Sequence, residues 1–574
     1  MRATRRLKIA VMLSLACGLT ASAHADDDSR RPHAKHVLLI SVDGLHQADL
    51  DWFVNANPNS TLALLARHGV TYTNAQTPFP SDSFPGMVGQ VTGGNPRTTG
   101  IYYDDAYSRS LLPQGTTAAN CHSTKAGAEV FYAEVIAKDL NRLDSGQNIP
   151  GLYADFSKIS QLTGHAQDLI NPALLPVSPI TCQPVYPHQY LKVNTVFEVA
   201  KKHGLHTAWA DKHAAYEILN GPSGGGIDDL FAPEINSSVT DPALPAGPGD
   251  DWTKDNTNTQ RYDSFKVKAV INWIKGFDHA GNGKPGTPAI YGMNFQSVST
   301  AQKLNKSNYY PDPNNTGNKV PGGLGGYTAN GTTPNVVLQS ALNFVNNQLA
   351  LVMSEIDPTN TVVILSAKHG QSPQNRADLT IINDGDMIDA LNCAWEKFAA
   401  TCKDPSKPHL VAHAMDDDGI LLWLNDRSPA ALRFARSFLL GYSGNGLGSD
   451  ATGTAVTKAF SQAGVTKIYA GEEAADLFGV GRNDDRVPDL VGIAQQGTVY
   501  AGGKLSKIAE HGGGARQDRH VPIVVWGAGI NRNIVDDPVQ TNQIAPTILA
   551  LLGLKPHELQ AVQVEHTKVL PDLH

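Results

Sequence analysis

The most constraining feature of the sequence is a set of three uninterrupted apolar runs, each with polar side chains beside it. The runs and their polar neighbours are 36–42 with Asp43, 361–366 with Lys368 and His369, and 521–526 with His511. An apolar run without alternation is typical of a strand buried on both faces of a parallel sheet. Open α/β sheets bind ligands beyond the carboxyl ends of their strands. The sequence therefore predicts a buried sheet with a polar site at one edge.

Helical patterns lie between these runs. They cover Ser60–His68, Thr195–His203, Phe265–Lys275, Val336–Glu355 and Ala430–Leu440. Alternating strands and helices predict an α/β fold with a mainly parallel central sheet and helices on both faces. We expect one large domain over 26–574. The segment 220–333 is rich in Gly, Pro, Asn and Thr, and we interpret it as a loop-rich insertion that forms a lid, a substrate wall or plain surface decoration.

The amino terminus has the pattern of a secretory signal. Basic residues precede a short apolar run, Ile9 to Ala16, and Ala23-His24-Ala25 forms an A-x-A cleavage site. We expect residues 1–25 to be removed and the mature protein to be periplasmic or secreted. The apolar run is shorter than the roughly 20 residues of a membrane helix, so we expect no membrane span.

Charge and cysteine content narrow the possible partners and the compartment. A net charge of −8 with no basic stripe argues against a nucleic-acid duplex as a partner. Four cysteines remain after the signal, and an even number in an oxidising compartment favours two disulfides. Cys393 with Cys402 would close a short loop and Cys121 with Cys182 a longer one, although the sequence permits three pairings. Nothing in the sequence indicates the oligomeric state.

Ser83 lies just before a predicted helix that has Pro85 near its start. The helix would direct free N–H groups toward an anion beside Ser83. Taken alone, a serine in this place is more often a helix cap. Ser83 is thus a candidate nucleophile with a capping alternative.

The wider segment resembles the nucleophile region of the nucleotide pyrophosphatase/phosphodiesterase family of the alkaline phosphatase superfamily. The matching residues, in order and spacing, are Ser83-Phe84-Pro85, Val91-Thr92-Gly93, Pro96 and Gly100-Ile101. Further motifs extend the resemblance over nearly the whole mature chain. They are Asp43-Gly44, His369-Gly370, His511-Gly512 and Ile544-Ala545-Pro546-Thr547.

The resemblance implies an exported hydrolase that cleaves phosphodiester or pyrophosphate bonds of nucleotides or small organophosphates. In this family the nucleophile forms a covalent phospho-enzyme intermediate beside two zinc ions. Carried over by motif, Asp43, Ser83 and His369 would belong to one metal site and His511 to the other. Zinc is therefore the expected cofactor.

Four positions depart from the family pattern. Lys368 replaces a metal-binding aspartate, and Gln296 and Thr300 stand where the family has an aspartate and a histidine. Asp104 replaces an asparagine that donates a hydrogen bond to the phosphoryl oxygen. Gln296 and Asp104 are therefore expected to face the substrate, and the metal centre to hold one ion rather than two.

Three hypotheses account for these changes. In the first, Lys368 fills the volume of a missing metal, stabilises the transition state and pairs with Asp104. In the second, Asp104 joins Asp43, His369 and His511 around one divalent ion, which could be Mg²⁺, Mn²⁺ or Ca²⁺ as well as zinc. In the third, the metal chemistry is lost and the chain is a binding protein. A one-metal sulfate or phosphonate ester hydrolase is a further alternative.

Four other polar clusters have weaker patterns. Asp211-Lys212-His213 follows an alternating run and could contact a leaving group, but we favour a solvated turn. Asp416–Asp418 and Asp484-Asp485 lack the spacing of a calcium loop, and we interpret both as solvated loops. Asp518-Arg519-His520 either positions His511 or simply precedes the strand at 521.

Overall fold

The structure is a computed structural model, and it describes residues 33–132, 136–238, 252–313, 315–396, 402 and 409–573. The side chains of 315–318 are not among those described. The predicted signal peptide, residues 1–25, lies outside the described residues.

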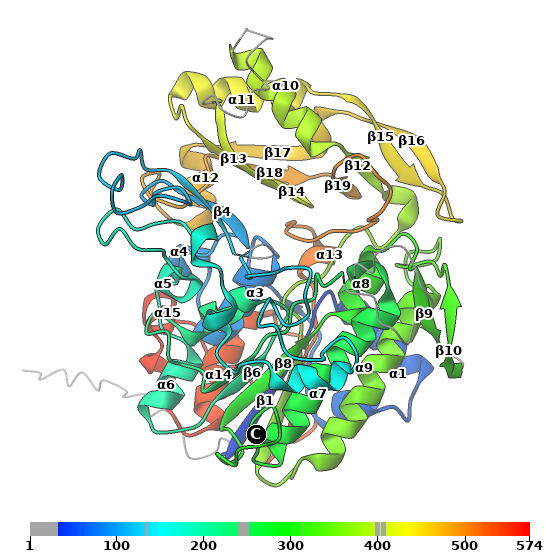
Figure 1. Cartoon of the computed structure of the whole chain (residues 1–574). Coiled ribbons are helices and arrows are strands. Elements are labelled where there is room, and N and C mark those ends of the chain that lie inside the picture. The colour runs from blue at the N-terminus through cyan, green and yellow to red at the C-terminus, as the bar shows by residue number, and fades with distance from the viewer. Residues whose placement is uncertain are drawn as a thin grey trace, which may run out of the picture.

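The centre of the molecule is an eight-stranded sheet in the order β21-β2-β20-β11-β1-β8-β6-β7 (Figure 1). Its strands are β1 His36–Val42, β2 Val70–Tyr72, β6 Ala208–Ala210, β7 Asp229–Phe231, β8 Ile290–Phe295, β11 Thr361–Ser366, β20 Ile523–Gly527 and β21 Asn533–Val535. Strand β20 runs antiparallel to β11 and β2, and the other neighbouring pairs are parallel. The predicted α/β class with a mainly parallel sheet is confirmed.

The middle strands form because their sequences can be buried on both faces. All six residues of β8 and of β11 are buried, as are six of the seven residues of β1. Each buried Val, Leu or Ile side chain contributes about 1.5 to 3 kcal/mol relative to exposure. Gly292 in β8 is required by close packing, because a Cβ there would lie 1.9 Å from the Leu39 carbonyl oxygen of β1.

Helices cover both faces of the sheet (Figure 1). One group consists of α2 Thr61–His68, α7 Asn256–Ile274, α8 Ser297–Lys303 and α9 Val336–Glu355, and the other of α3 Ser83–Thr92, α6 Val196–Lys202, α14 Ile544–Leu551 and α15 Gln560–Glu565. The predicted helices at α2, α6, α9 and α11 (Pro429–Gly441) are confirmed, and the one at 265–275 is the second half of α7. Among the described residues, α9 alone is long and apolar enough to cross a membrane by composition, and it packs against α7 and α8.

The interpretation of 220–333 as a loop-rich insertion is wrong from residue 256 onward. This segment contains α7 and α8, the hairpin of β9 Tyr309–Asp312 and β10 Asn315–Pro321, and the central strand β8. Gly- and Pro-rich stretches flank these elements, so average composition concealed a strand of the core.

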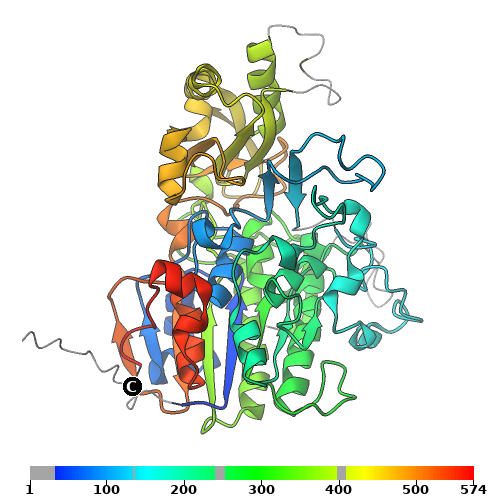
Figure 2. The ribbon, with the colours of Figure 1, turned by 90° about the vertical axis from the view of Figure 1, so that its left-hand side faces the viewer.

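A second lobe, residues 379–500, lies over the carboxyl ends of the main sheet (Figures 1 and 2). We call it the cap lobe. Its two four-stranded sheets are β13-β14-β18-β17 and β16-β15-β12-β19. The strands are β12 Thr380–Ile382, β13 Val411–Asp416, β14 Gly419–Leu424, β15 Gly444–Ser449, β16 Ala455–Phe460, β17 Val465–Ala470, β18 Leu490–Ala494 and β19 Thr498–Tyr500, with helices α10 Asp384–Glu396, α11 and α12 Glu472–Phe478. It has a hydrophobic cluster of its own.

Two disulfides are present, Cys121–Cys182 and Cys393–Cys402. They are one of the three pairings that the sequence permits, and the expected number of two disulfides is confirmed. Two disulfides fit an oxidising compartment.

Candidate active site

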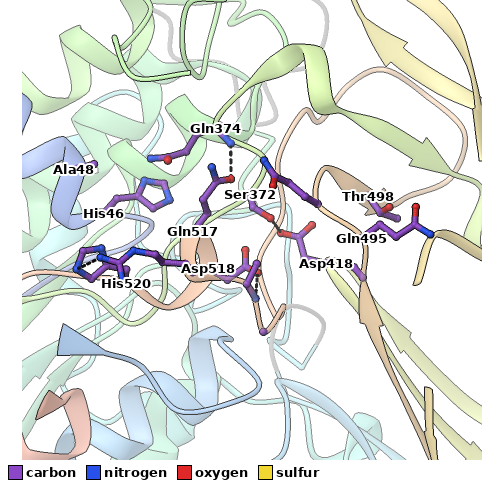
Figure 3. Close-up of a pocket in the computed structure, with 15 residues that line it drawn as sticks. His46, Ala48, Ser372, Gln374, Asp418, Gln495, Thr498, Gln517, Asp518 and His520 are labelled. Carbon is purple, nitrogen blue, oxygen red and sulfur yellow. Dashed lines mark hydrogen bonds between the residues drawn. The ribbon is translucent and has the colours of Figure 1, made fainter. Parts of the chain in front are cut away.

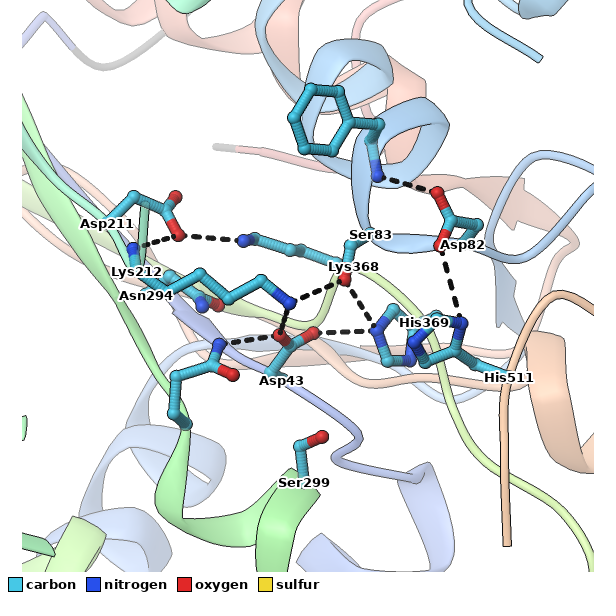
Figure 4. A network of polar contacts seen from close by, with 12 residues as sticks. Asp43, Asp82, Ser83, Asp211, Lys212, Asn294, Ser299, Lys368, His369 and His511 are labelled. Carbon is cyan, nitrogen blue, oxygen red and sulfur yellow. Dashed lines mark hydrogen bonds and ion pairs between the residues drawn. The ribbon is translucent and has the colours of Figure 1, made fainter. Parts of the chain in front are cut away.

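Ser83 is the first residue of α3, a helix whose ten residues are all buried. Asp82 is the N-cap, and its Oδ2 accepts a hydrogen bond from the Phe84 N–H at 3.0 Å. The capping alternative for Ser83 is therefore wrong. The Ser83 hydroxyl lies 3.1 Å from His369 Nε2 and accepts a hydrogen bond from Lys212 Nζ at 3.2 Å (Figure 4).

Helix α3 packs closely against the segment that carries Lys368 and His369. A Cβ on Gly86 would lie 2.2 Å from the Lys368 carbonyl oxygen, so only glycine allows this approach. The contact fixes the distance between Ser83 and His369.

We expect Gly86→Ala to lower the free energy of unfolding by about 1 to 3 kcal/mol through overpacking. Urea unfolding followed by circular dichroism would measure the change. Gly225→Ala is the matched control, because a Cβ at Gly225 meets nothing within 4 Å. Equal stability of the two variants would mean that α3 is not held against Lys368.

Four adjacent parallel strands each bring polar residues to the same edge of the sheet. Asp43 follows β1, Lys368 and His369 follow β11, Asp211 and Lys212 follow β6, and Gln296 follows β8. All six side chains are buried. The candidate residues Asp43, Ser83, Lys368 and His369, far apart in sequence, are thus in one cluster (Figure 4). Gln296 joins this cluster through its hydrogen bond to Asp43.

Asp43 is the central carboxylate of this cluster. Its Oδ2 accepts a hydrogen bond from Gln296 Nε2 at 2.6 Å and lies 3.7 Å from Lys212 Nζ, and its Oδ1 lies 2.9 Å from His369 Nε2. Burial acts to raise the pKa of Asp43, but the charges of His369, Lys368 and Lys212 hold it well below its usual value. Asp43 is therefore a carboxylate anion.

Gln296 is held in place through its backbone. The Asp263 carboxylate accepts hydrogen bonds from the N–H groups of Gln296 and Ser297, and Lys266 pairs with it at 3.0 Å. Thr300 makes no contact with the cluster, because its hydroxyl bonds to the Ser297 carbonyl and accepts from Asn256.

Lys368 pairs with Asp211 and not with Asp104. Its Nζ donates to Asp211 Oδ1 at 2.9 Å and lies 3.9 Å from the centre of the Tyr216 ring. Burial lowers the pKa of Lys368 to about 8. The hypothesis of a Lys368–Asp104 pair is wrong. Asp104 instead donates its backbone N–H to Asp82 Oδ2 at 3.1 Å.

The interpretation of Asp211-Lys212-His213 as a solvated turn is also wrong. All three residues are buried, Asp211 accepts from the Trp209 indole, and His213 pairs with Glu234 at 2.8 Å. Lys212 donates to Ser83 Oγ and so belongs to the site, although its sequence pattern predicted a solvated turn. The signal was present, since this triad follows an apolar run just as Asp43 does.

His511 lies beside His369 on the side of the cluster that faces the cap lobe, with 4.1 Å between the ring centroids. Its Nδ1 lies 3.3 Å from Asp82 Oδ1 and 4.0 Å from Asp417 Oδ2. Asp417 comes from the turn between β13 and β14, and Tyr103 donates to its Oδ2 at 2.8 Å. Asp416–Asp418 is therefore not a solvated loop.

Burial raises the pKa of both Asp82 and Asp417, and it lowers the pKa of His511 well below its usual value. These shifts show that the protein alone solvates charge poorly on this side of the cluster.

Asp518 positions the backbone next to His369, and not the side chain of His511. Its carbonyl oxygen accepts from the Gly370 N–H at 2.6 Å, and its Oδ2 accepts from the Ala515 N–H at 3.2 Å. Asp484 pairs with Lys192 at the surface, and Asp485 accepts from Ser108, so neither is at the site.

A cavity of about 400 Å³ lies between the main sheet and the cap lobe but is not the Ser83 site (Figure 3). His46, Ser372, Asp418, Gln495 and Asp518 are among the residues that line it. Ser83 is not among the residues that line it, and Asp418 is, whereas Asp417 Oδ2 lies 4.0 Å from His511 Nδ1.

The residues fit one divalent ion better than the two zinc ions of the family. Two ligand atoms that bond the same ion at about 2.0 to 2.2 Å lie about 3 Å from each other. Asp43 Oδ1 lies 2.9 Å and Ser83 Oγ 3.1 Å from His369 Nε2. Asp43 Oδ1 is buried, and His369 Nε2 is its partner at 2.9 Å. The second zinc of the family would need an acid and an imidazole as ligands, and this chain has Gln296 and Thr300 at those positions. The Gln296 amide donates to Asp43, and the Thr300 hydroxyl is hydrogen-bonded to the Ser297 carbonyl.

Comparison with known proteins gives a family match for the chain. The model of the type I phosphodiesterase / nucleotide pyrophosphatase family matches residues 37–517. No curated protein matches the chain significantly.

Two solved structures illustrate the fold. Wild-type alkaline phosphatase PafA is 14% identical with a TM-score of 0.54, over 91% of this chain and 96% of that one. An inactive variant of murine ectonucleotide pyrophosphatase/phosphodiesterase 5, in complex with AMP, is 12% identical with a TM-score of 0.50 over the same shares.

The family match covers most of the chain, and the fold likeness extends over nine-tenths of it. The chain therefore belongs to the type I phosphodiesterase/nucleotide pyrophosphatase family of the alkaline phosphatase superfamily and is a phosphoric ester hydrolase.

Proposed function

We propose that the chain hydrolyses phosphodiester or pyrophosphate bonds of small molecules, such as nucleotides or organophosphates, with Ser83 as the nucleophile. The observation that carries the proposal is the position of Ser83 Oγ at the start of a buried helix, between His369 Nε2 and Lys212 Nζ. In the first step, Ser83 Oγ bonds to phosphorus as the bond to the leaving oxygen breaks. The second substituent of the substrate stays on phosphorus, and water then breaks the bond between Ser83 Oγ and phosphorus, which releases the phosphate monoester and regenerates the hydroxyl.

Fixed positive charge around Ser83 suits this chemistry. Lys212 donates to the attacking oxygen, and Lys368, held by Asp211, adds a second cation within the buried cluster. The first N–H groups of α3 are directed toward an anion at Ser83. Such preorganised charges stabilise the negative charge that develops on phosphoryl oxygens. Gln296 and Asp104 remain the proposed contacts to the substrate.

A single divalent ion, zinc in the first instance, completes the proposed site. Its ligands come from the donors around Ser83, for which the family motifs indicate Asp43, Ser83, His369 and His511. When bound, the ion supplies Lewis-acid stabilisation of the phosphoryl oxygens.

Separate observations support a nucleotide substrate and the export of the protein. AMP in the complex of the murine relative supports a nucleotide as substrate. Two disulfides and the predicted signal at 1–25 support export to the periplasm or the exterior.

Trapping the intermediate tests the proposal directly. The purified protein, loaded with zinc, is mixed with bis-p-nitrophenyl phosphate, quenched in acid and mapped by peptide mass spectrometry. We expect a p-nitrophenyl-phosphoryl group on Ser83, formed with release of one p-nitrophenolate, that disappears after the substrate is exhausted. Steady turnover with Ser83 unmodified at every time point would contradict the covalent mechanism.

A further inference from the structure

A network of buried polar side chains that the proposed chemistry does not use lies next to the site. Its members are each at most 6% exposed, and they are His46, Asp49, Ser299, Gln302, Tyr327 and Gln371. In the part of the chain that the structure describes, none of their buried side-chain N and O atoms lacks a hydrogen-bond partner. A buried network with every member satisfied is rigid, so it can fix the position of the segments that carry it.

Asp49, on α1 (Gln47–Ala56), is the centre of this network. Its Oδ2 accepts hydrogen bonds from His46 Nδ1 and Gln302 Nε2, both at 2.9 Å. Its Oδ1 accepts from the Tyr327 hydroxyl at 2.7 Å. Hydrogen bonds to a charged acceptor are about twice as strong as those between neutral groups. Asp49 therefore holds α1, α8 and the segment before α9 together.

His46 connects Asp49 to the turn that carries His369. Its Nδ1 donates to Asp49, and its Nε2 donates to the Gln371 carbonyl oxygen at 2.8 Å and lies 3.0 Å from the Gln371 backbone nitrogen. Burial acts to lower the pKa of His46, but the charge of Asp49 and the hydrogen bonds to Asp49 and Gln371 hold it above its usual value. An imidazolium donates from both ring nitrogens, as these two contacts require.

The side chain of Gln371 extends the network to α8. Its Nε2 donates to Gln302 Oε1 at 2.6 Å and to the Ser299 carbonyl oxygen at 3.2 Å. Its Oε1 accepts from the hydroxyl of Ser299, which is labelled in Figure 4, at 2.8 Å. Both ends of the amide are thus bound to the helix that follows β8.

The network joins the three segments that bring Asp43, Gln296 and His369 to the site. These segments follow β1, β8 and β11, which are neighbours in the sheet. The network has a member two or three residues after each of them, namely His46, Ser299 and Gln371. Asp43 contacts Gln296 at 2.6 Å and His369 at 2.9 Å, so a shift of one segment against another would change these contacts.

We propose that His46, together with Asp49, is a positioning residue of this enzyme that holds the His369 turn in place relative to Asp43. The inference rests on the proposed function, in which Asp43 and His369 belong to the active site. His46 acts through the backbone of Gln371 and not on the substrate. Tyr327 gives the segment before α9 a part in the same role.

Two variants of His46 separate its two hydrogen bonds. The amide of His46→Gln can donate to the Gln371 carbonyl oxygen in place of Nε2, whereas the shorter amide of His46→Asn replaces only Nδ1. We expect His46→Asn to lower kcat for bis-p-nitrophenyl phosphate by about 10- to 100-fold, with KM changed less than about threefold. His46→Gln should recover kcat to within about threefold of wild type. Initial rates and Tm are measured on the full mature chain.

His279→Asn is the matched control. His279 is 8% exposed, and it donates from Nδ1 to Asp229 at 2.6 Å and from Nε2 to the Leu162 carbonyl oxygen at 2.8 Å. It thus makes the same two kinds of bond as His46, but beside β7 at the edge of the sheet. We expect both His→Asn variants to lower Tm and only His46→Asn to lower kcat.

Tyr327→Phe tests the network if the His46 variants fail to fold. It removes a single hydroxyl from Asp49 and should lower kcat by about threefold to tenfold, a smaller effect because Tyr327 is one contact further from His369. An unchanged kcat in this variant would contradict the positioning role of Asp49.

Three results with the histidine variants would overturn the inference. They are an unchanged kcat in His46→Asn, an equal loss of kcat in His46→Asn and His46→Gln, and an equal loss of kcat in His279→Asn. The proposed function is judged separately, by the p-nitrophenyl-phosphoryl group on Ser83. Its absence from the wild-type protein would refute the covalent mechanism, whereas the ratios of kcat between variants would still decide the role of His46.

Discussion

Ser83→Ala is expected to lower kcat/KM for bis-p-nitrophenyl phosphate by on the order of 10⁴-fold, the scale seen when a covalent nucleophile is removed. The groups around its hydroxyl are the His369 imidazole, the Lys212 ammonium and the capping carboxylate Asp82, and none of them carries a hydroxyl. The fold should survive, since only one hydroxyl is lost. Initial rates over a range of substrate concentrations measure the effect.

Ser60→Ala is the matched control for Ser83→Ala. Ser60 begins α2 and accepts a hydrogen bond from the Ala63 N–H, so it is also a serine at a helix start but belongs to another helix. Loss of this cap costs about 1 kcal/mol of stability and leaves kcat/KM unchanged. A Ser83→Ala enzyme with more than about a tenth of wild-type activity would identify another nucleophile.

The parts of the site that follow directly from strand ends were predictable. Apolar runs gave β1 and β11 with their bounds, and the residues after them, Asp43 and His369, lie where an α/β sheet binds ligands. The helix at Ser83 was visible from Pro85 and the residues after it. These signals are local, so a single sequence carries them.

Lys212 was missed because its local pattern fits a turn equally well. An alternating run of five residues before a charged triad is typical of an edge strand with a solvated end. The structure gives β6 only three residues, but it places them beside the buried β8, and this long-range pairing is what buries Lys212.

The positions of Asp82 and Asp417 beside His511 could not be predicted from sequence for a different reason. Asp82 looks like an ordinary helix cap, which it is, and only the position of His511 gives its second oxygen another contact. Asp417 lies in an acidic turn of the cap lobe, and no sequence rule places that lobe over the sheet. Contacts between separate hydrophobic clusters depend on packing that composition does not encode.

Lys212→Met is expected to lower kcat by about 10²- to 10³-fold, the usual effect of removing one preorganised charge from a transition state. Methionine keeps the length and the apolar part of the side chain but removes the ammonium that donates to Ser83 Oγ. KM should change less than kcat, because the lost hydrogen bond is to the attacking oxygen and not to the substrate.

Lys201→Met is the control for Lys212→Met, because Lys201 is a lysine that pairs with Asp228 at the surface and should leave kcat unchanged. Lys212→Arg should recover part of the rate, since it restores the charge in a different shape. An unchanged kcat in Lys212→Met would show that the ammonium only neutralises Asp43. In that case the charge that the transition state needs would have to come from Lys368 and the metal ion. Because Asp43 would then lack its nearest cation, the same variant would bind the divalent ion more tightly if the ion approaches Asp43 at all. Unaltered metal affinity in this variant would instead place the ion on the side of the site that holds His511.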